Sequence, residues 1–227
     1  MHDAPPTDTF LTYAIGDIHG SFDKLRTLLK RCETHAAGRD RAFVFLGDYI
    51  DRGADSSGVV RLLMELQSAA PNRVVTLMGN HEAMALAVID GTADAELWLP
   101  QGGAAMLKSY GVDRPCDLPA DHVDWMRRLP LAHDDGRRLF VHAGVNPEKP
   151  LDAQSDDDLL WIREPFLSDD RDLGRLIVHG HTPTLGRRPE RRGGRLGLDT
   201  GAVYGGPLTA AVFAAEETEP LGFLHAD

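Results

Sequence analysis

Five motifs in this chain place an acidic, amide or imidazole side chain directly after an apolar run. They read GDIHG (16–20), GDYIDRG (47–53), GNHE (79–82), HAG (142–144) and GHTP (180–183). The first three follow predicted strands at residues 11–15, 42–46 and 73–78, with predicted helices at 21–32 and 56–67 between them. Strands that alternate with helices indicate an α/β fold whose sheet is largely parallel at the start. Ligands of such sheets bind beyond the carboxyl ends of the strands, where these motifs lie.

The middle of the chain has a different pattern, which predicts a helical insertion at about residues 83–135. Helices are expected at 83–89, 96–111 and 121–128, and strands return at 138–142, 175–179, 195–199 and 208–213. The second half leaves little room for crossover helices, so its strands are expected to be more antiparallel. We predict a single domain over residues 1–227, with two sheets packed face to face and helices outside.

Composition limits the classes of function. The chain has 24 basic and 35 acidic residues, a net charge of −11, which argues against a basic surface that grips a nucleic-acid duplex or an anionic membrane. No apolar run is long enough for a membrane span, and the first ten residues do not resemble a signal peptide. Cys32 and Cys116 are isolated, which favours a reducing compartment. We therefore expect a cytoplasmic protein. A monomer is also expected.

The residue types in the motifs are those of metal sites. Asp17 and His19 share one tight turn, and the two oxygens of Asp48 can bridge two cations. Neutral nitrogen and oxygen ligands are available from Asn80, His142 and His181. This mixed set suits manganese, iron or zinc better than magnesium or calcium. Two neighbouring metals can share a hydroxide and lower its pKa toward neutrality.

Each motif has a plainer interpretation when taken alone. An Asp-x-His turn is usually surface or capping chemistry, and GNHE can be a turn before a helix. HAG and GHT can mark buried, hydrogen-bonded histidines. The conjunction of all five motifs, each after a strand-like run, favours the two-metal interpretation.

These blocks resemble those of the calcineurin-like metallophosphoesterases. Within that group they are most similar to the phosphoprotein phosphatase family of serine/threonine phosphatases, in its bacterial and bacteriophage branch. LDTGAVYGGPLTA (198–210) resembles the ending of the bacterial members, so nearly the whole chain is covered. The resemblance implies a four-layer αββα sandwich with two mixed sheets.

The resemblance also implies a role for each motif residue. One divalent metal would be bound by Asp17, His19 and Asp48. The second would share Asp48 and be completed by Asn80, His142 and His181. Manganese is the metal expected, with iron, zinc or magnesium as alternatives, and a hydroxide between the metals would attack phosphorus in line.

The catalytic side chains follow in the same way. His81 would be the general acid, oriented by Asp51, and phosphate would be bound by Arg52 and Arg163. Arg163 depends on the weaker block LLWIREP (159–165) and has a surface arginine as its alternative. His179 is expected to be a structural neighbour.

Three functions are compatible with these residues. Asp51 and Glu82 favour hydrolysis of phosphoserine or phosphothreonine in a phosphorylated protein or peptide. The alternative is a symmetrical bis(5'-nucleosyl)-tetraphosphatase acting on dinucleoside polyphosphates, a branch that typically reads GNHD and replaces the aspartate of D-R-G. A metal-holding module without catalysis would need neither His81 nor Arg52. The arginine-rich segment 187–195 is either a solvated hairpin tip or a basic lip that attracts phosphorylated substrates.

Overall fold

A computed structural model describes residues 10–227. The prediction that the first ten residues are not a signal peptide concerns mainly residues 1–9, which lie outside the described residues. The first sheet has the order β10-β9-β1-β2-β3. In it β1, β2 and β3 are parallel, as predicted, while β9 pairs antiparallel with β1 and β10 with β9. Its strands are β1 (Leu11–Ile15), β2 (Arg41–Phe45), β3 (Val74–Thr76), β9 (Leu208–Ala214) and β10 (Gly222–Ala226).

The second sheet has the order β4-β5-β6-β8-β7. The antiparallel pairing of β9 and β10 in the first sheet agrees with the expectation of a more antiparallel second half. In the second sheet, by contrast, the three inner strands are parallel. Only the two edge strands pair antiparallel. Long loops and the short helix α7 (Asp156–Trp161) return the chain between β5 and β6, so a long crossover helix is not needed. The strands are β4 (Ala132–Asp134), β5 (Arg138–Val141), β6 (Leu176–His179), β7 (Glu190–Arg192) and β8 (Arg195–Gly197).

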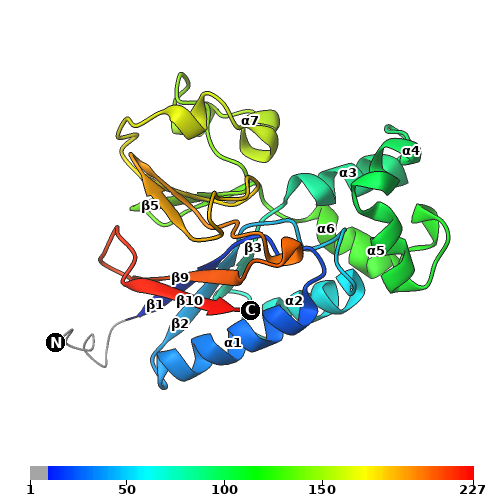
Figure 1. Ribbon diagram of the computed structural model, residues 1–227, viewed down its shortest axis with the longest axis horizontal. Helices are drawn as coiled ribbons and strands as arrows, with labels where there is room; N and C mark the ends of the chain where they lie inside the picture. The colour runs from blue at the N-terminus through cyan, green and yellow to red at the C-terminus, as the bar shows by residue number, and fades with distance from the viewer. Residues whose placement is uncertain (1–9) are drawn as a thin grey trace.

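Successive side chains of a strand point to opposite faces of its sheet, and this alternation divides the core into layers. Leu11, Tyr13 and Ile15 of β1 belong to the cluster under α1 (Phe22–Ala36) and α2 (Ser56–Ala69). Ala14 instead joins the cluster between the sheets, which includes Phe140 and Phe213. A third cluster lies between the second sheet and α7. Figure 1 shows the resulting order of layers, with α1 and α2 below the first sheet and α7 above the second. The predicted face-to-face packing of two mixed sheets with flanking helices is confirmed.

The segment between β3 and β4 is mainly helical. It contains α3 (Asn80–Ile89), α4 (Ala95–Trp98), α5 (Gly103–Tyr110) and α6 (Ala120–Arg127). These helices gather beside the first sheet, at the right of Figure 1. The helix predicted over 96–111 is broken, because Leu99–Gln101 forms a 3-10 turn and Gly102 has a φ of 127°. Further 3-10 turns are Pro115–Asp117, Leu151–Ala153, Phe166–Ser168 and Ala202–Tyr204.

None of the helices within residues 10–227 combines the length and the apolar character required to cross a membrane.

Candidate metal centre

The six predicted metal ligands converge from five separate segments of the chain. They follow β1, β2, β3, β5 and β6, so the two sheets together build one cluster. All six are buried, with the largest exposed fraction, 7%, at His181. The set is Asp17, His19, Asp48, Asn80, His142 and His181.

Asp48 lies at the centre of this cluster. Its Oδ2 is 3.2 Å from His19 Nε2 and 4.0 Å from His81 Nε2. Its Oδ1 is 3.4 Å from His142 Nε2. The side chains therefore form two metal-capable groups that share Asp48, namely His19–Asp48–His81 and Asp48–His142–His181. One carboxylate with an oxygen directed at each group has the geometry of a bridging ligand.

Asn80 joins the second group through its side-chain oxygen. Asn80 Oδ1 lies 2.8 Å from His142 Nε2 and 2.9 Å from His181 Nδ1. The first group contains His81 and does not contain Asp17, which the family resemblance implied as a ligand of the first metal. Asp17 lies beside the cluster and accepts hydrogen bonds from the backbone N–H of His181 at 3.0 and 3.1 Å.

The donor set fits divalent cations. The Nδ1–H of His19 donates to the Ile50 carbonyl, and that of His142 donates to the Leu46 carbonyl, each at 2.8 Å. Each Nε2 is then left with a lone pair directed into the cluster. Metal-ligating histidines usually have their second nitrogen fixed in this way. Converging lone pairs of nitrogen and oxygen repel one another unless a cation lies between them.

The protonation states agree with this interpretation. Burial lowers the pKa of His142, and burial is also the main cause that lowers the pKa of His181 to about 3. Both imidazoles are therefore neutral near pH 7, as ligation requires. Burial, followed by the charges of Asp199 and Asp48, raises the pKa of Asp17 well above its usual range. A cation near Asp17 would relieve that repulsion.

Asp199 is a buried acid of this region that the sequence pattern did not single out. It is 5% exposed and accepts a hydrogen bond from the backbone N–H of Gly201 at 3.0 Å. Burial raises its pKa. It lies two residues after the end of β8, and this position after a strand is the signal that could have identified it.

The turns that carry the site are conformationally costly. Among residues 10–227, seven non-glycine residues have positive φ, and five of them belong to the site: His19, Asp48, Asp51, Arg52 and His181. Such conformations persist only where the surrounding structure holds them. Gly79 is needed for one close approach, because a Cβ there would overlap the backbone nitrogen and Oδ1 of Asp48.

Glu82 holds two of these turns together. Its carboxylate accepts hydrogen bonds from the backbone N–H groups of Gly79 and Asp48, both at 2.9 Å, and of Tyr49 at 2.8 Å. Glu82 is 0% exposed. It is engaged by the protein backbone and cannot contact a substrate. Its identity is therefore weak evidence for a phosphoprotein substrate.

His81 and Asp51 form a buried pair next to the cluster. His81 Nδ1 donates to Asp51 Oδ2 at 2.6 Å, which leaves Nε2 facing Asp48. The guanidinium of Arg52 contacts His19 Nε2 and lies 5.6 Å from the centre of the exposed Tyr204 ring. The structure thus brings together three residues with predicted catalytic roles, namely the expected acid His81, the expected orienting carboxylate Asp51 and the expected phosphate ligand Arg52.

Arg163 and His179 have different positions. Arg163 is exposed just after α7, close enough that its charge contributes to the lowered pKa of His181. His179 is 1% exposed and packs edge-on against Phe166, with ring centres 5.0 Å apart, and belongs to neither metal-capable group.

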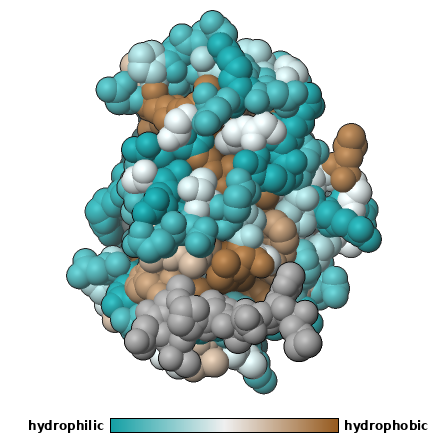
Figure 2. All heavy atoms as spheres, turned by 90° about the vertical axis from the view of Figure 1, so that its left-hand side faces the viewer, coloured by the Kyte–Doolittle hydropathy of each residue, from teal (hydrophilic) through white to brown (hydrophobic). Residues whose placement is uncertain are grey.

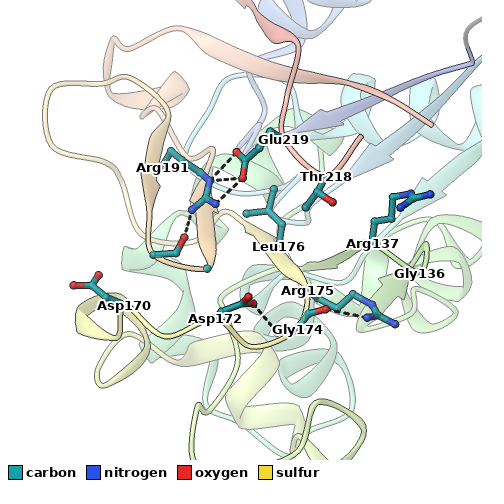
Figure 3. A pocket seen from close by; sticks show the side chains of 12 residues that line it. Gly136, Arg137, Asp170, Asp172, Gly174, Arg175, Leu176, Arg191, Thr218 and Glu219 are labelled. Atoms are coloured by element: carbon teal, nitrogen blue, oxygen red, sulfur yellow. Dashed lines mark hydrogen bonds and ion pairs between the residues drawn. The ribbon is translucent and has the colours of Figure 1, made fainter. Parts of the chain in front are cut away.

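A cavity of about 520 Å³ lies away from this cluster. It is bordered by the β9–β10 turn, the red loop at the left of Figure 1, and Figure 2 shows that end of the molecule as mostly hydrophilic. Figure 3 shows its arginines and acids, and none of the predicted site residues lines it. Arg191 pairs with Glu219, and Arg175 with Asp134 at 3.3 Å. Paired charges leave the cavity without a net attraction for phosphate.

The arginine-rich segment is mostly engaged in similar pairs. Arg191 and Arg192 contact Glu219 and Asp170, and the buried Arg195 contacts Glu190 at 2.7 Å. Arg187 approaches the backbone of Gly205, next to Tyr204. These pairs favour the hairpin interpretation over a continuous basic lip.

Comparisons with known proteins agree on one family. The family model described as calcineurin-like phosphoesterase matches residues 10–211. The serine/threonine-protein phosphatase 1 of Salmonella typhimurium is 32% identical over 216 residues, which are 88% of this chain and 90% of that protein.

Two further proteins carry a different name. The symmetrical bis(5'-nucleosyl)-tetraphosphatase of Dechloromonas aromatica is 36% identical over 139 residues, 60% of this chain. The chain matches only 45% of the length of that relative. A crystal structure described as a putative diadenosine tetraphosphatase has a TM-score of 0.70 and 25% identity, covering 96% of this chain and 94% of that one.

Proposed function

The chain belongs to the calcineurin-like phosphoesterase family and is a metallophosphoesterase, and from this premise we propose that it cleaves dinucleoside tetraphosphates symmetrically. The sequence pattern favoured a phosphoprotein substrate, and the relatives named for tetraphosphate hydrolysis favour the alternative at least as well. Asp51 and Glu82 were the two residues that favoured a phosphoprotein. The carboxylate of Glu82 is bound to backbone N–H groups, so Glu82 cannot contact a substrate and does not discriminate between the two substrate classes.

The observation that carries this proposal is a pair of exposed aromatic rings on either side of the cluster. Tyr204 is 53% exposed and lies over Arg52 at the His19 end. Trp161 is 39% exposed, and its ring centre lies 6.3 Å from that of His181 at the other end. A substrate with phosphates in the middle and a base at each end matches this arrangement. Stacking of a base on an aromatic ring contributes about 1–3 kcal/mol.

The site residues would share the chemistry as follows. Bound divalent cations supply Lewis-acid activation of water and neutralise phosphoryl oxygens. The residues that would hold them are Asp17, His19, Asp48, Asn80, His142 and His181. Arg52 and Arg163 bind and orient the phosphate oxygens as planar donors.

Proton transfer falls to His81. Its Nδ1 is committed to Asp51, so Nε2 is the atom that gives a proton to the leaving oxygen. Asp51 fixes the ring orientation and supports the positive charge of the protonated imidazole.

A phosphoprotein is the second candidate substrate. The relative named serine/threonine-protein phosphatase 1 matches this chain over 90% of its own length, whereas the tetraphosphatase relative matches over 45%.

The deciding experiment compares kcat/KM for diadenosine tetraphosphate and a phosphoserine peptide, with manganese added. Symmetrical cleavage gives ADP as the only nucleotide product. We expect the dinucleotide to be preferred, and Tyr204→Ala and Trp161→Ala each to raise its KM about tenfold through lost stacking. A preference for the phosphopeptide, or release of ATP and AMP, would overturn the proposal.

A further inference from the structure

We propose that Trp98 is a positioning residue for the reaction, which holds Asp51 in the orientation that His81 requires. The inference rests on the proposed function, because it takes His81 as the group that protonates the leaving oxygen. Because Trp98 belongs to α4, the helical segment between β3 and β4 would then contribute to the positioning of the catalytic residues.

The contact is a buried hydrogen bond to the oxygen that also binds His81. The indole Nε1–H of Trp98 donates to Asp51 Oδ2 at 2.8 Å, and the same oxygen lies 2.6 Å from His81 Nδ1. All three side chains are at most 1% exposed. Within residues 10–227, Asp51 Oδ1 has no hydrogen-bond partner. Trp98 is therefore the one described donor, besides His81, that orients this carboxylate.

The residues that follow Trp98 contact the turn at Asp51 and Arg52 through their backbone. The carbonyl of Gly102 accepts a hydrogen bond from the backbone N–H of Arg52 at 3.2 Å. A Cβ at Gly102 would lie 2.5 Å from that nitrogen and 2.8 Å from Asp51 Cβ. A Cβ at Gly103 would overlap the indole ring of Trp98. The two glycines thus allow the segment 98–103 to press against the turn and against its own tryptophan.

The turn needs such support. Asp51 and Arg52 have consecutive positive φ values of 70° and 65°. Two adjacent side-chain-bearing residues in this conformation are costly and need contacts from outside the turn. Relaxation of the turn would rotate the Asp51 carboxylate away from His81 Nδ1. His81 Nε2 would then lose its fixed direction toward the leaving oxygen.

Trp98 is also a core residue, so the test must separate packing from the hydrogen bond. Trp98→Phe keeps an aromatic ring against Gly103 and removes the N–H. Loss of general-acid positioning should slow the cleavage of poor leaving groups more than of good ones. We expect kcat to fall about tenfold for phenyl phosphate and less than about threefold for p-nitrophenyl phosphate. KM and the number of bound manganese ions should stay at the wild-type values.

The chain offers a matched control in Trp125 of α6. Its Nε1–H also donates to a side chain, Gln67 Oε1 at 2.8 Å, and it is 5% exposed. Trp125→Phe removes a comparable buried hydrogen bond elsewhere in the helical segment. We expect any change it causes to be equal for the two phosphates.

A double-mutant cycle with Asp51→Asn tests whether Trp98 affects kcat through Asp51. If Trp98 acts through Asp51, Trp98→Phe causes little further loss of kcat in the Asp51→Asn background. Equal losses on both phosphates, or an undiminished loss in that background, would overturn the inference.

His81→Asn, measured on the same two phosphates, distinguishes the role of Trp98 from the general-acid role of His81. If it shows the leaving-group dependence and Trp98→Phe does not, the inference about Trp98 fails alone. If His81→Asn shows no such dependence, the general-acid role fails and the inference fails with it.

Discussion

Asn80 Oδ1 lies 2.8 Å from His142 Nε2, so an oxygen and a nitrogen that both carry lone pairs face each other in a buried cluster. A cation between them converts this repulsion into ligation, which binds metal to the folded state alone. The contact therefore links metal binding to stability as well as to catalysis.

Manganese should raise the melting temperature of the protein in a concentration-dependent way. Binding to the native state alone adds about 2.7 kcal/mol at a ligand concentration of 100 times Kd. Asp48→Asn, which removes the shared ligand, should abolish most of this shift and lower metal affinity by at least about a hundredfold. Calorimetry with and without chelator, together with metal analysis, measures both. An Asp48→Asn protein that retains two ions would contradict the bridging role.

His81→Asn should reduce kcat by about 10²–10⁴ on substrates with poor leaving groups. The substitution should leave the metal content unchanged, because the proposed role of His81 is proton transfer. Metal analysis decides between this role and ligation, since His81 also belongs to the first metal-capable group. Loss of one ion per chain would assign His81 to the metal.

The thiol of Cys32 should make the fold sensitive to alkaline pH. Burial raises its pKa to about 12 from an ordinary value of 9. Between these values the unfolded chain releases the proton and the folded chain keeps it. Stability should therefore fall as pH rises above 9, by up to roughly 1.4 kcal/mol per unit from this group.

Urea unfolding of wild type and Cys32→Ala between pH 8 and 10.5 measures that slope. The variant should lose less stability over the range than wild type does. A thiol reagent at pH 8 should label Cys116, which is exposed, and reach Cys32 only after unfolding. Rapid labelling of both thiols in the native protein would be inconsistent with the buried position.

Arg138 should be a major contributor to stability. It starts β5 of the second sheet and donates to two carbonyls of the first sheet's side, that of Ala214 at the end of β9 at 3.3 Å and that of Glu217 in the following turn at 3.0 Å. Its guanidinium is paired with Asp135 at 2.6 Å and lies 4.5 Å from the ring centre of Phe213. Arg138→Ala should lower the free energy of unfolding by about 2–4 kcal/mol, because it removes the buried contact with Phe213 and a donor to the Ala214 carbonyl.

The neighbouring Arg137 provides the control. Its side chain is 44% exposed and pairs with Glu216 on the surface, where such pairs contribute about 0–1 kcal/mol. Denaturant titration should therefore show Arg137→Ala close to wild type. Similar losses for the two variants would mean that the link between the sheets is not what stabilises the fold.

Local patterns in the sequence were sufficient to predict β1, β2 and β3 and the polar residues that follow them, whereas the edge strand β10 was not predicted. Apolar runs of about five residues predict strands, and Gly-Asp or Gly-Asn after a run marks a strand's carboxyl end. Parallel strands bring those ends to one edge, so the convergence of Asp17, Asp48 and Asn80 follows from order along the chain. The family, which was inferred from the resemblance of the five motifs, and the two-sheet architecture are confirmed.

Only the tertiary structure decided how distant segments meet. The parallel order of the second sheet, the inward direction of Glu82 and the approach of Trp98 to Asp51 have no local signature. Trp98 is 47 residues from Asp51 in the chain, and its indole reaches that carboxylate only because two glycines let their segments pack closely. Residue types determine which chemistry is available, whereas long-range packing determines which atoms point at one another.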